Sequence, residues 1–121
     1  MTSALLTAGE VVVQLTELSR QLDLTVTMLK DADLDATVKR HEADLAESHA
    51  YVSAEGSVDL RKHLARIACE RQESQAVVAE AVVRYLRQRI NSISIRIDVG
   101  RSYGAVVRAE LQSVGYAEQA S

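Results

Sequence analysis

Four acidic residues in the first half of the chain have the spacing of a calcium-binding loop. They match positions 1, 3, 5 and 12 of an EF-hand, where carboxylate oxygens coordinate the ion: Asp31, Asp33, Asp35 and Glu42. Such a loop needs glycine at position 6 for its sharp turn, and this chain has Ala36 there. The apolar spacing of a helix also continues through the segment. We therefore interpret the four residues as an acidic helical turn and predict no metal site.

Zinc and thiol chemistry are also poorly supported. His41 followed by Glu42 matches the start of a zinc-protease helix, but Leu45 stands where the second histidine ligand belongs. The three histidines lack the spacing of a metal cluster. Cys69 is the single cysteine and precedes Glu70, whose carboxylate would raise the thiol pKa rather than lower it. We predict no metal, no disulfide within the chain and no nucleophilic cysteine.

The glycine pair at positions 100 and 104 does not form a phosphate loop. The segment from Gly100 to Gly104 lacks both the Gly-Lys pair and the spacing of a Walker motif. A helical bundle of this length also offers no deep cleft that could shield a reaction from water. The sequence therefore predicts a protein that is not an enzyme, with no cofactor and no small-molecule substrate.

Arginines are concentrated in the second half of the chain. Between positions 84 and 108 the only acid is Asp98, whereas six arginines occur and no lysine: Arg84, Arg87, Arg89, Arg96, Arg101 and Arg108. Guanidinium groups suit bidentate contacts with phosphate or carboxylate, so this segment could bind nucleic acid or an acidic partner. Only Tyr85 and Tyr103 lie nearby as aromatic groups, which does not favour a base-stacking platform.

Pairing within the chain is the alternative explanation for these arginines. Residues 1–56 contain four basic and ten acidic residues, a net charge of −6, whereas residues 57–121 contain ten basic and seven acidic residues, a net charge of +3. The two halves should attract each other. Acids of the first half could therefore neutralise the arginines without any ligand.

Long helices are expected to carry these residues, because the chain has no proline and only five glycines. Residues 10–55 are predicted as the first helix, with a bend near 31–35 left open. Its apolar or small residues alternate at spacings of 4 and 3, with one break at Lys39: Val11, Leu15, Leu18, Leu22, Thr25, Leu29, Ala32, Ala36, Ala43, Ala46 and Ala50. The change from leucine to alanine would let a partner helix approach more closely in the second part.

A turn and two further helices are predicted after residue 55. Gly56 is expected to end the first helix and Ser57 to cap the second, over 57–99. The second apolar stripe comprises Leu60, Leu64, Ile67, Val78, Val82, Leu86, Ile90, Ile93 and Ile97. Residues 93–99 alternate as in a strand, but we favour helix because a lone strand would have no partner. Gly100 is expected to end this helix, with a short third helix over 102–114, a flexible start over 1–9 and a frayed tail over 115–121.

The predicted fold is a single all-α domain of 121 residues, a long antiparallel helical hairpin with a short third C-terminal helix. Two long amphipathic helices bury too little of their stripes alone, so we expect a homo-oligomer. Its self-association residues would come from the two stripes: Leu15, Leu18, Leu22, Leu29, Leu86, Ile90, Ile93 and Ile97. Oligomer number, and whether helices pair within or between chains, stay open.

No apolar run approaches the about 20 residues needed to span a bilayer, and the N-terminus lacks a signal peptide, so we expect a cytoplasmic protein without membrane contact. About half of the chain resembles small helical proteins encoded by actinobacteriophages and by related phages and prophages of Gram-positive hosts. The resemblance rests on the runs 50–58 (AYVSAEGSV) and 96–105 (RIDVGRSYGA), with Arg61, Lys62, Arg108, Ala109 and Glu110. It implies a phage early protein, often encoded among replication and recombination genes, with no catalytic residues to carry over.

Three functions follow as hypotheses. The first is a non-enzymatic accessory protein of phage DNA replication or recombination, in an infected bacterial host, that contacts single-stranded DNA or a recombinase or nuclease. The second is a host-directed protein that docks a helix into a bacterial target, using its N-terminal arm. The third is a virion or scaffold component.

Overall fold

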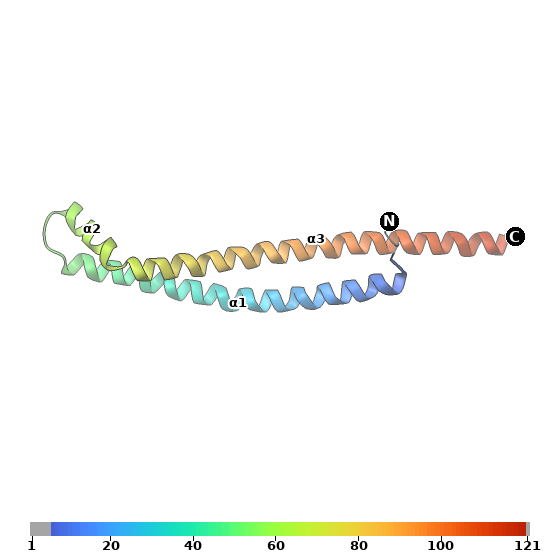
Figure 1. The fold of residues 1–121 in the computed structure, drawn as a ribbon, viewed down its shortest axis with the longest axis horizontal. Coiled ribbons are helices and arrows are strands. Elements are labelled where there is room, and N and C mark those ends of the chain that lie inside the picture. The colour runs from blue at the N-terminus through green and yellow to red at the C-terminus, as the bar shows by residue number, and fades with distance from the viewer. Residues whose placement is uncertain (1–5, 121) are drawn as a thin grey trace, which may run out of the picture. The chain divides into compact units, whose positions relative to one another are not determined.

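The computed structural model describes residues 6–120 and is helical nearly throughout, with no strand among these residues. Its elements are α1 (Ala8–Ser53), α2 (Val58–Ala68) and α3 (Glu70–Ala120) (Figure 1). The predicted all-α class is confirmed. The expected flexible start over 1–9 lies partly outside the described residues, but Ala8 and Gly9 already belong to α1.

The start of α1 is a capping box that the sequence analysis missed. The Thr7 hydroxyl oxygen accepts a hydrogen bond from the Glu10 backbone N–H at 3.1 Å, and a Glu10 carboxylate oxygen accepts one from the Thr7 N–H at 3.3 Å. This reciprocal pair satisfies two backbone donors that a helix start otherwise leaves unpaired. The Thr-x-x-Glu spacing of residues 7–10 is the sequence pattern that predicts such a capping box. From there α1 remains helical through residues 31–35.

The predicted turn after α1 occurs where expected. Gly56 has a φ of +117°, a conformation that residues with a side chain rarely adopt. Ser57 then caps α2, because its hydroxyl accepts a hydrogen bond from the Leu60 backbone N–H at 3.2 Å. The sequence predicted this turn because glycine tolerates the positive φ and serine supplies the capping hydroxyl.

The predicted second helix over 57–99 is wrong in both extent and end point. The chain leaves helical geometry at Cys69 (φ −104°, ψ 11°), so that α2 ends there and α3 begins at Glu70. The Cys69 N–H still donates to the Ala65 carbonyl oxygen at 3.1 Å, and the Cys69 carbonyl accepts from the Glu73 N–H at 2.9 Å. Helical hydrogen bonds thus continue on both sides of Cys69, and α2 lies at an angle to the start of α3 (Figure 1).

The predicted stop at Gly100, the short helix over 102–114 and the frayed tail over 115–121 are also wrong within the described residues, because α3 continues to Ala120. Gly100 has no positive φ. Instead it permits a close approach, since a Cβ at Gly100 would lie 2.8 Å from Leu15 Cδ2. One at Gly104 would lie 3.3 Å from Val11 Cγ1. These glycines serve helix packing rather than helix termination. Residue 121 lies outside the described residues.

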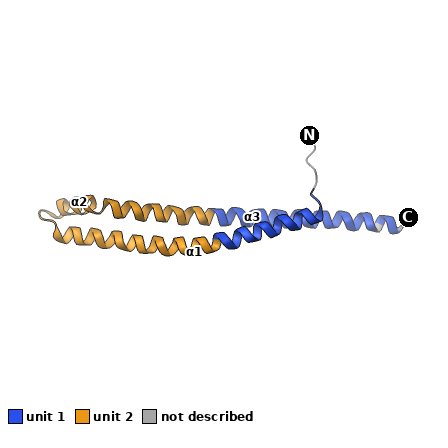
Figure 2. Ribbon diagram, turned by 60° about the horizontal axis from the view of Figure 1, so that its bottom comes forward, with its two compact units in different colours: residues 1–25, 89–121 blue, residues 26–88 orange. Residues whose placement is uncertain are grey.

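The chain comprises two compact units: unit 1 has residues 1–25 and 89–121, and unit 2 has residues 26–88 (Figure 2). In unit 1, Val11, Thr25, Ile93 and Ile97 are buried, and the Thr25 hydroxyl donates to the Gln21 carbonyl oxygen at 2.7 Å. Residues 93–99 belong to α3 and are helical, as predicted. Ile93 and Ile97 lie on the covered face of this helix.

Small side chains dominate the core of unit 2. Its buried residues are Ala36, Ala43, Ala65, Cys69, Ala76, Ala79, Val83 and Leu86. Ala36, Ala79 and Val83 form one cluster, against which Leu29 and Ala32 pack. Short side chains let helix axes approach closely, as expected from the alanine-rich part of the first stripe.

The second predicted stripe is only partly correct. Leu86, Ile93 and Ile97 are buried, but five of the large aliphatic residues before them are exposed: Leu60, Leu64, Ile67, Val78 and Val82. The covered positions in that segment belong to alanines and Cys69. A search for large aliphatic side chains therefore selected the wrong face between residues 60 and 82, because the actual packing surface consists of small residues.

Candidate nucleic-acid interface

The six candidate arginines all lie on α3, and all are exposed. The unit boundary divides them: Arg84 and Arg87 belong to unit 2, whereas Arg89, Arg96, Arg101 and Arg108 belong to unit 1. The cluster that looks continuous in the sequence therefore has two different environments.

The two arginines of unit 2 lie beside acids of the same unit. An Arg87 Nη2 atom is 3.8 Å from Asp33 Oδ1, and the charge of Arg84 helps to lower the pKa of Glu80. Both arginines line a groove with Asp33, Arg40 and Glu80. Arg87 therefore lies beside an acid of the first half, as the charge asymmetry suggested, whereas the acid beside Arg84 is Glu80, four residues earlier on α3 itself.

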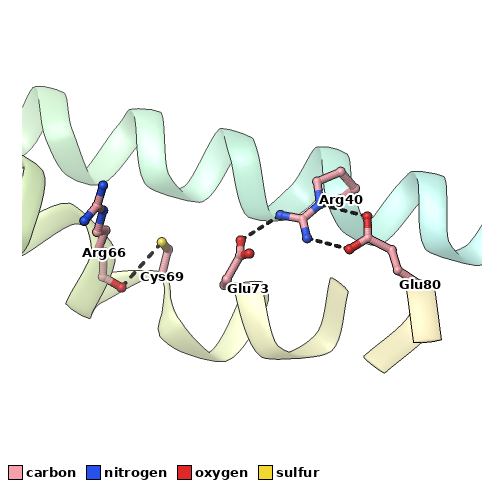
Figure 3. Close-up of polar contacts among 5 residues, drawn as sticks. All are labelled: Arg40, Arg66, Cys69, Glu73 and Glu80. Atoms are coloured by element: carbon pink, nitrogen blue, oxygen red, sulfur yellow. Dashed lines mark hydrogen bonds and ion pairs between the residues drawn. The ribbon is translucent and has the colours of Figure 1, made fainter. Parts of the chain in front are cut away.

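Arg40 of α1 forms three hydrogen bonds to two carboxylates in unit 2 and was not among the candidate residues. Its Nη1 donates to Glu73 Oε2 at 2.7 Å, while Nη2 and Nε donate to the two carboxylate oxygens of Glu80 at 2.7 and 3.2 Å (Figure 3). This fork geometry is the one arginine forms best with carboxylates. Hydrogen bonds from Arg40 lower the pKa of Glu80, and the two carboxylates raise the pKa of Arg40. No sequence pattern distinguishes Arg40 from the other basic residues of the acidic half, Arg20, Lys30 and Lys39.

We expect the ion pairs of Arg40 to make the free energy of unfolding depend on pH. Because the folded-state pKa of Glu80 lies below its ordinary value of 4.5, its pairing stabilises the fold above that pH and is lost as pH falls through the lowered pKa. Arg40→Met should therefore cost stability at pH 7, and the difference from the wild type should shrink at pH 3. Urea unfolding at the two pH values measures this. Arg71→Met is the control, since Arg71 is exposed and has no ion pair among the described residues. A difference that does not change with pH would contradict the prediction.

The four arginines of unit 1 have no acidic partner within 4 Å among residues 6–120. Arg89 and Arg96 are seven residues apart, so they share one face of α3, about 10.5 Å apart along its axis. Arg101 and Arg108 share another face in the same way. Five residues separate Arg96 from Arg101, a rotation of about 140° around the helix. The four therefore form two separate rows and not a single one.

An apolar groove of about 680 Å³ in unit 1 is lined by Arg96 of the first row, but not by Arg89. Leu15 and Leu18 of α1 and Val99 and Tyr103 of α3 line it, together with Arg96. The Tyr103 hydroxyl oxygen accepts a hydrogen bond from the Leu6 backbone N–H at 2.9 Å, which holds this ring in place. Tyr85, the other nearby aromatic residue, belongs to unit 2 and is exposed.

The residues predicted to mediate self-association are covered by the chain itself. Leu86, Ile93 and Ile97 are buried, and the other five are half-buried: Leu15, Leu18, Leu22, Leu29 and Ile90. In unit 1, Leu15 reaches the backbone of Gly100. These side chains therefore contribute to packing within the chain, and any contact with a second copy needs other surfaces as well.

The acidic turn and the thiol lie in settings that do not resemble reactive sites. Asp31, Asp33 and Asp35 lie within α1, and Asp35 pairs with Lys39 at 3.0 Å. In the described part of the chain, no three His, Cys, Asp or Glu side chains converge as metal ligands. Cys69 is buried, and this burial, with smaller contributions from the charges of Glu47 and Glu73, raises its thiol pKa. A raised pKa leaves less of the reactive thiolate at neutral pH.

Comparison with known proteins adds no relative: no family model, no curated protein and no solved structure matches this chain. Within residues 6–120, no helix combines the length and apolar character that a membrane span requires.

Proposed function

We propose that this chain is a non-enzymatic, self-associating antiparallel helical hairpin that serves phage DNA replication or recombination and binds single-stranded DNA through arginines of α3. The phage setting comes from the resemblance of residues 50–58 and 96–105. The antiparallel arrangement is supported within unit 2, where Asp33 pairs with Arg87 and the later Arg40 pairs with the earlier Glu80 and Glu73.

One observation carries the DNA-binding proposal. Arg89 and Arg96 are exposed on one face of α3 and have no acidic partner among the described residues, whereas Arg84 and Arg87 lie beside acids. A guanidinium group that is not neutralised within the chain keeps its full attraction for phosphate. Two such groups on one face can follow a flexible single strand, with a salt-dependent affinity.

The test compares two double variants in binding to labelled single-stranded DNA over a series of salt concentrations. Arg89→Ala with Arg96→Ala should reduce the steepness of log affinity against log salt by about 1.4, since each phosphate contact to a single strand contributes about 0.7. Arg84→Ala with Arg87→Ala is the matched control and should change the slope little. Salt-independent binding by the wild type, or equal losses in the two variants, would contradict the proposal.

A second candidate function, docking into a protein of the bacterial host, is favoured by a different observation. The helix α2 turns Ala65 inward and leaves Leu60, Leu64 and Ile67 exposed. These three residues have the i, i+4, i+7 spacing with which helices bind apolar grooves. The exposed residues make α2 the docking helix in this second function, in place of the N-terminal arm. Two results would favour this second function. The wild type would not bind DNA, and Leu64→Asp would abolish its capture of a host protein.

A further inference from the structure

The apolar groove of unit 1 has the size and the lining of a small-molecule site. Its volume is about 680 Å³, and such sites typically measure about 300–1,000 Å³. Most of the described residues that line it are aliphatic, among them Leu15 and Leu18 of α1 and Ile95 and Val99 of α3. Val99 is 63% exposed, so the chain itself leaves this part of the groove uncovered. An apolar molecule lying there would remove aliphatic surface from water, which is favourable.

The charges in the lining are unequal in their pairing. Among the described residues that line the groove, Arg96 is the one cation and Glu17 is the one acid. The Glu17 carboxylate is already engaged, because it accepts hydrogen bonds from Arg20 Nη2 at 2.7 Å and from Arg20 Nε at 3.0 Å. Hydrogen bonds from Arg20 and Gln21 lower the pKa of Glu17 to about 2, so this group is charged at neutral pH. Arg96, in contrast, has no acidic partner within 4 Å among residues 6–120. The groove therefore presents one guanidinium group that is not neutralised.

Arg96 and Tyr103 lie near the two ends of the groove on its α3 side. They are seven residues apart, so they share one face of the helix and are separated by about 10.5 Å along its axis. Between them, Gly100 allows a close approach of Leu15. The hydrogen bond from the Leu6 backbone N–H to the Tyr103 hydroxyl oxygen fixes the ring at its end. An elongated molecule in the groove would thus meet a positive charge at one end and an aromatic ring at the other.

We propose that this groove binds a free fatty acid, with its carboxylate on Arg96 and its aliphatic chain along Leu15, Leu18 and Val99. The two oxygens of a carboxylate match the fork of a guanidinium group. A single negative charge fits better than the double charge of a phosphate monoester, because one cation and the Glu17 carboxylate share the lining. The inference goes beyond the proposed function, since it requires neither DNA nor a second copy of the chain.

The experiment titrates the full chain with decanoate at pH 7 in a calorimeter. The wild type should bind one decanoate per chain. From hexanoate to decanoate the affinity should rise about fourfold for each added methylene, because each one leaves water for the apolar lining. Circular dichroism, recorded on the same samples, checks that the chain stays helical.

Arg96→Gln tests the contact with the carboxylate. It should weaken the binding of decanoate about fivefold or more and leave that of the neutral decanol unchanged. Arg101→Gln is the matched control, since Arg101 is exposed on the same helix and does not line the groove. Both ligands should bind to this variant as they do to the wild type.

Val99→Glu tests the contact with the aliphatic chain. It should abolish the binding of decanoate, because a carboxylate would then lie in the apolar lining. Val106→Glu is the matched control, since Val106 is 55% exposed on the same helix and does not line the groove. Both positions are exposed, so neither substitution should unfold the chain.

Four results would overturn the inference. They are no binding of decanoate by the wild type, several decanoates per chain, equal losses in the Arg96 and Arg101 variants, and binding to phosphatidylglycerol vesicles without binding of free decanoate. Dimers that are lost with Val99→Glu, in a chain that does not bind decanoate, would instead assign the groove to a second copy. The DNA test is read from the salt dependence without any fatty acid, so either proposal can fail while the other stands.

Discussion

Replacing Ile93 with alanine is expected to lower the free energy of unfolding by about 2–4 kcal/mol. Ile93 is only 3% exposed, and it lies in the part of α3 that belongs to unit 1. Removal of three carbon atoms from a covered position loses their transfer free energy and leaves a cavity that the neighbours fill only in part. Urea unfolding followed by circular dichroism measures the change.

The same substitution two residues later is the matched control. Ile95 is 53% exposed, so Ile95→Ala removes the same atoms from the surface and should cost less than about 1 kcal/mol. The comparison also tests the backbone, because residues 93, 95 and 97 would share one face of a strand but not of a helix. Equal losses at Ile93 and Ile95 would contradict the helical packing of this segment.

Enlarging Ala76 to leucine is expected to destabilise the chain by about 1–3 kcal/mol or more. Ala76 is 0% exposed and belongs to the core of small residues in unit 2. A leucine there has no space unless the neighbouring helices separate, which would weaken the packing of Ala36, Ala79 and Val83 as well. The midpoint of thermal unfolding should fall accordingly.

Ala81→Leu provides the control for this enlargement. Ala81 is exposed on the same helix, and alanine and leucine have similar helix propensities, so its effect should lie within about 0.5 kcal/mol. A tolerated leucine at Ala76, with stability equal to that of the Ala81 variant, would show that the small residues are not closely packed.

The sequence predicted the covered face of α1 well. Every residue of the first stripe is buried or half-buried, from Val11 to Ala50. This success has a physical basis, since α1 is uninterrupted and a regular spacing then keeps the same residues on one face. The turn at Gly56 and Ser57 was also predicted, because positive φ and N-capping are local properties of individual residues.

The second half was harder to predict because its packing depends on partners distant in sequence. Nothing local marks Cys69 as the end of a helix, and the break there turns Ala65 inward and Leu64 outward. Gly100 has the residue type of a helix terminus, but Leu15 packs against it instead. The roles of these residues follow from which side chain lies opposite them, information that local rules do not contain.

The candidate arginines were likewise predicted in part from the sequence and distinguished only by the tertiary structure. Composition drew attention to all six, and the acidic first half raised the alternative of internal pairing, which is seen for Arg87 with Asp33. Only the tertiary structure separated Arg84 and Arg87, which lie beside acids, from Arg89 and Arg96, which have no acidic partner among the described residues. The Coulomb energy of a pair depends on distance, and sequence spacing does not determine distances between helices.

By itself, the sequence determined the helical class, the long first helix, its covered face and the turn that follows it, because the absence of proline, regular apolar spacing and capping residues act locally. The tertiary structure decided where the later helices break, which of their faces is covered and which arginines lie beside acids. Those outcomes depend on close packing of small residues and on ion pairs across more than 30 residues of chain, such as Arg40 with Glu73 at |i−j| = 33. Such contacts form only when distant segments are brought together.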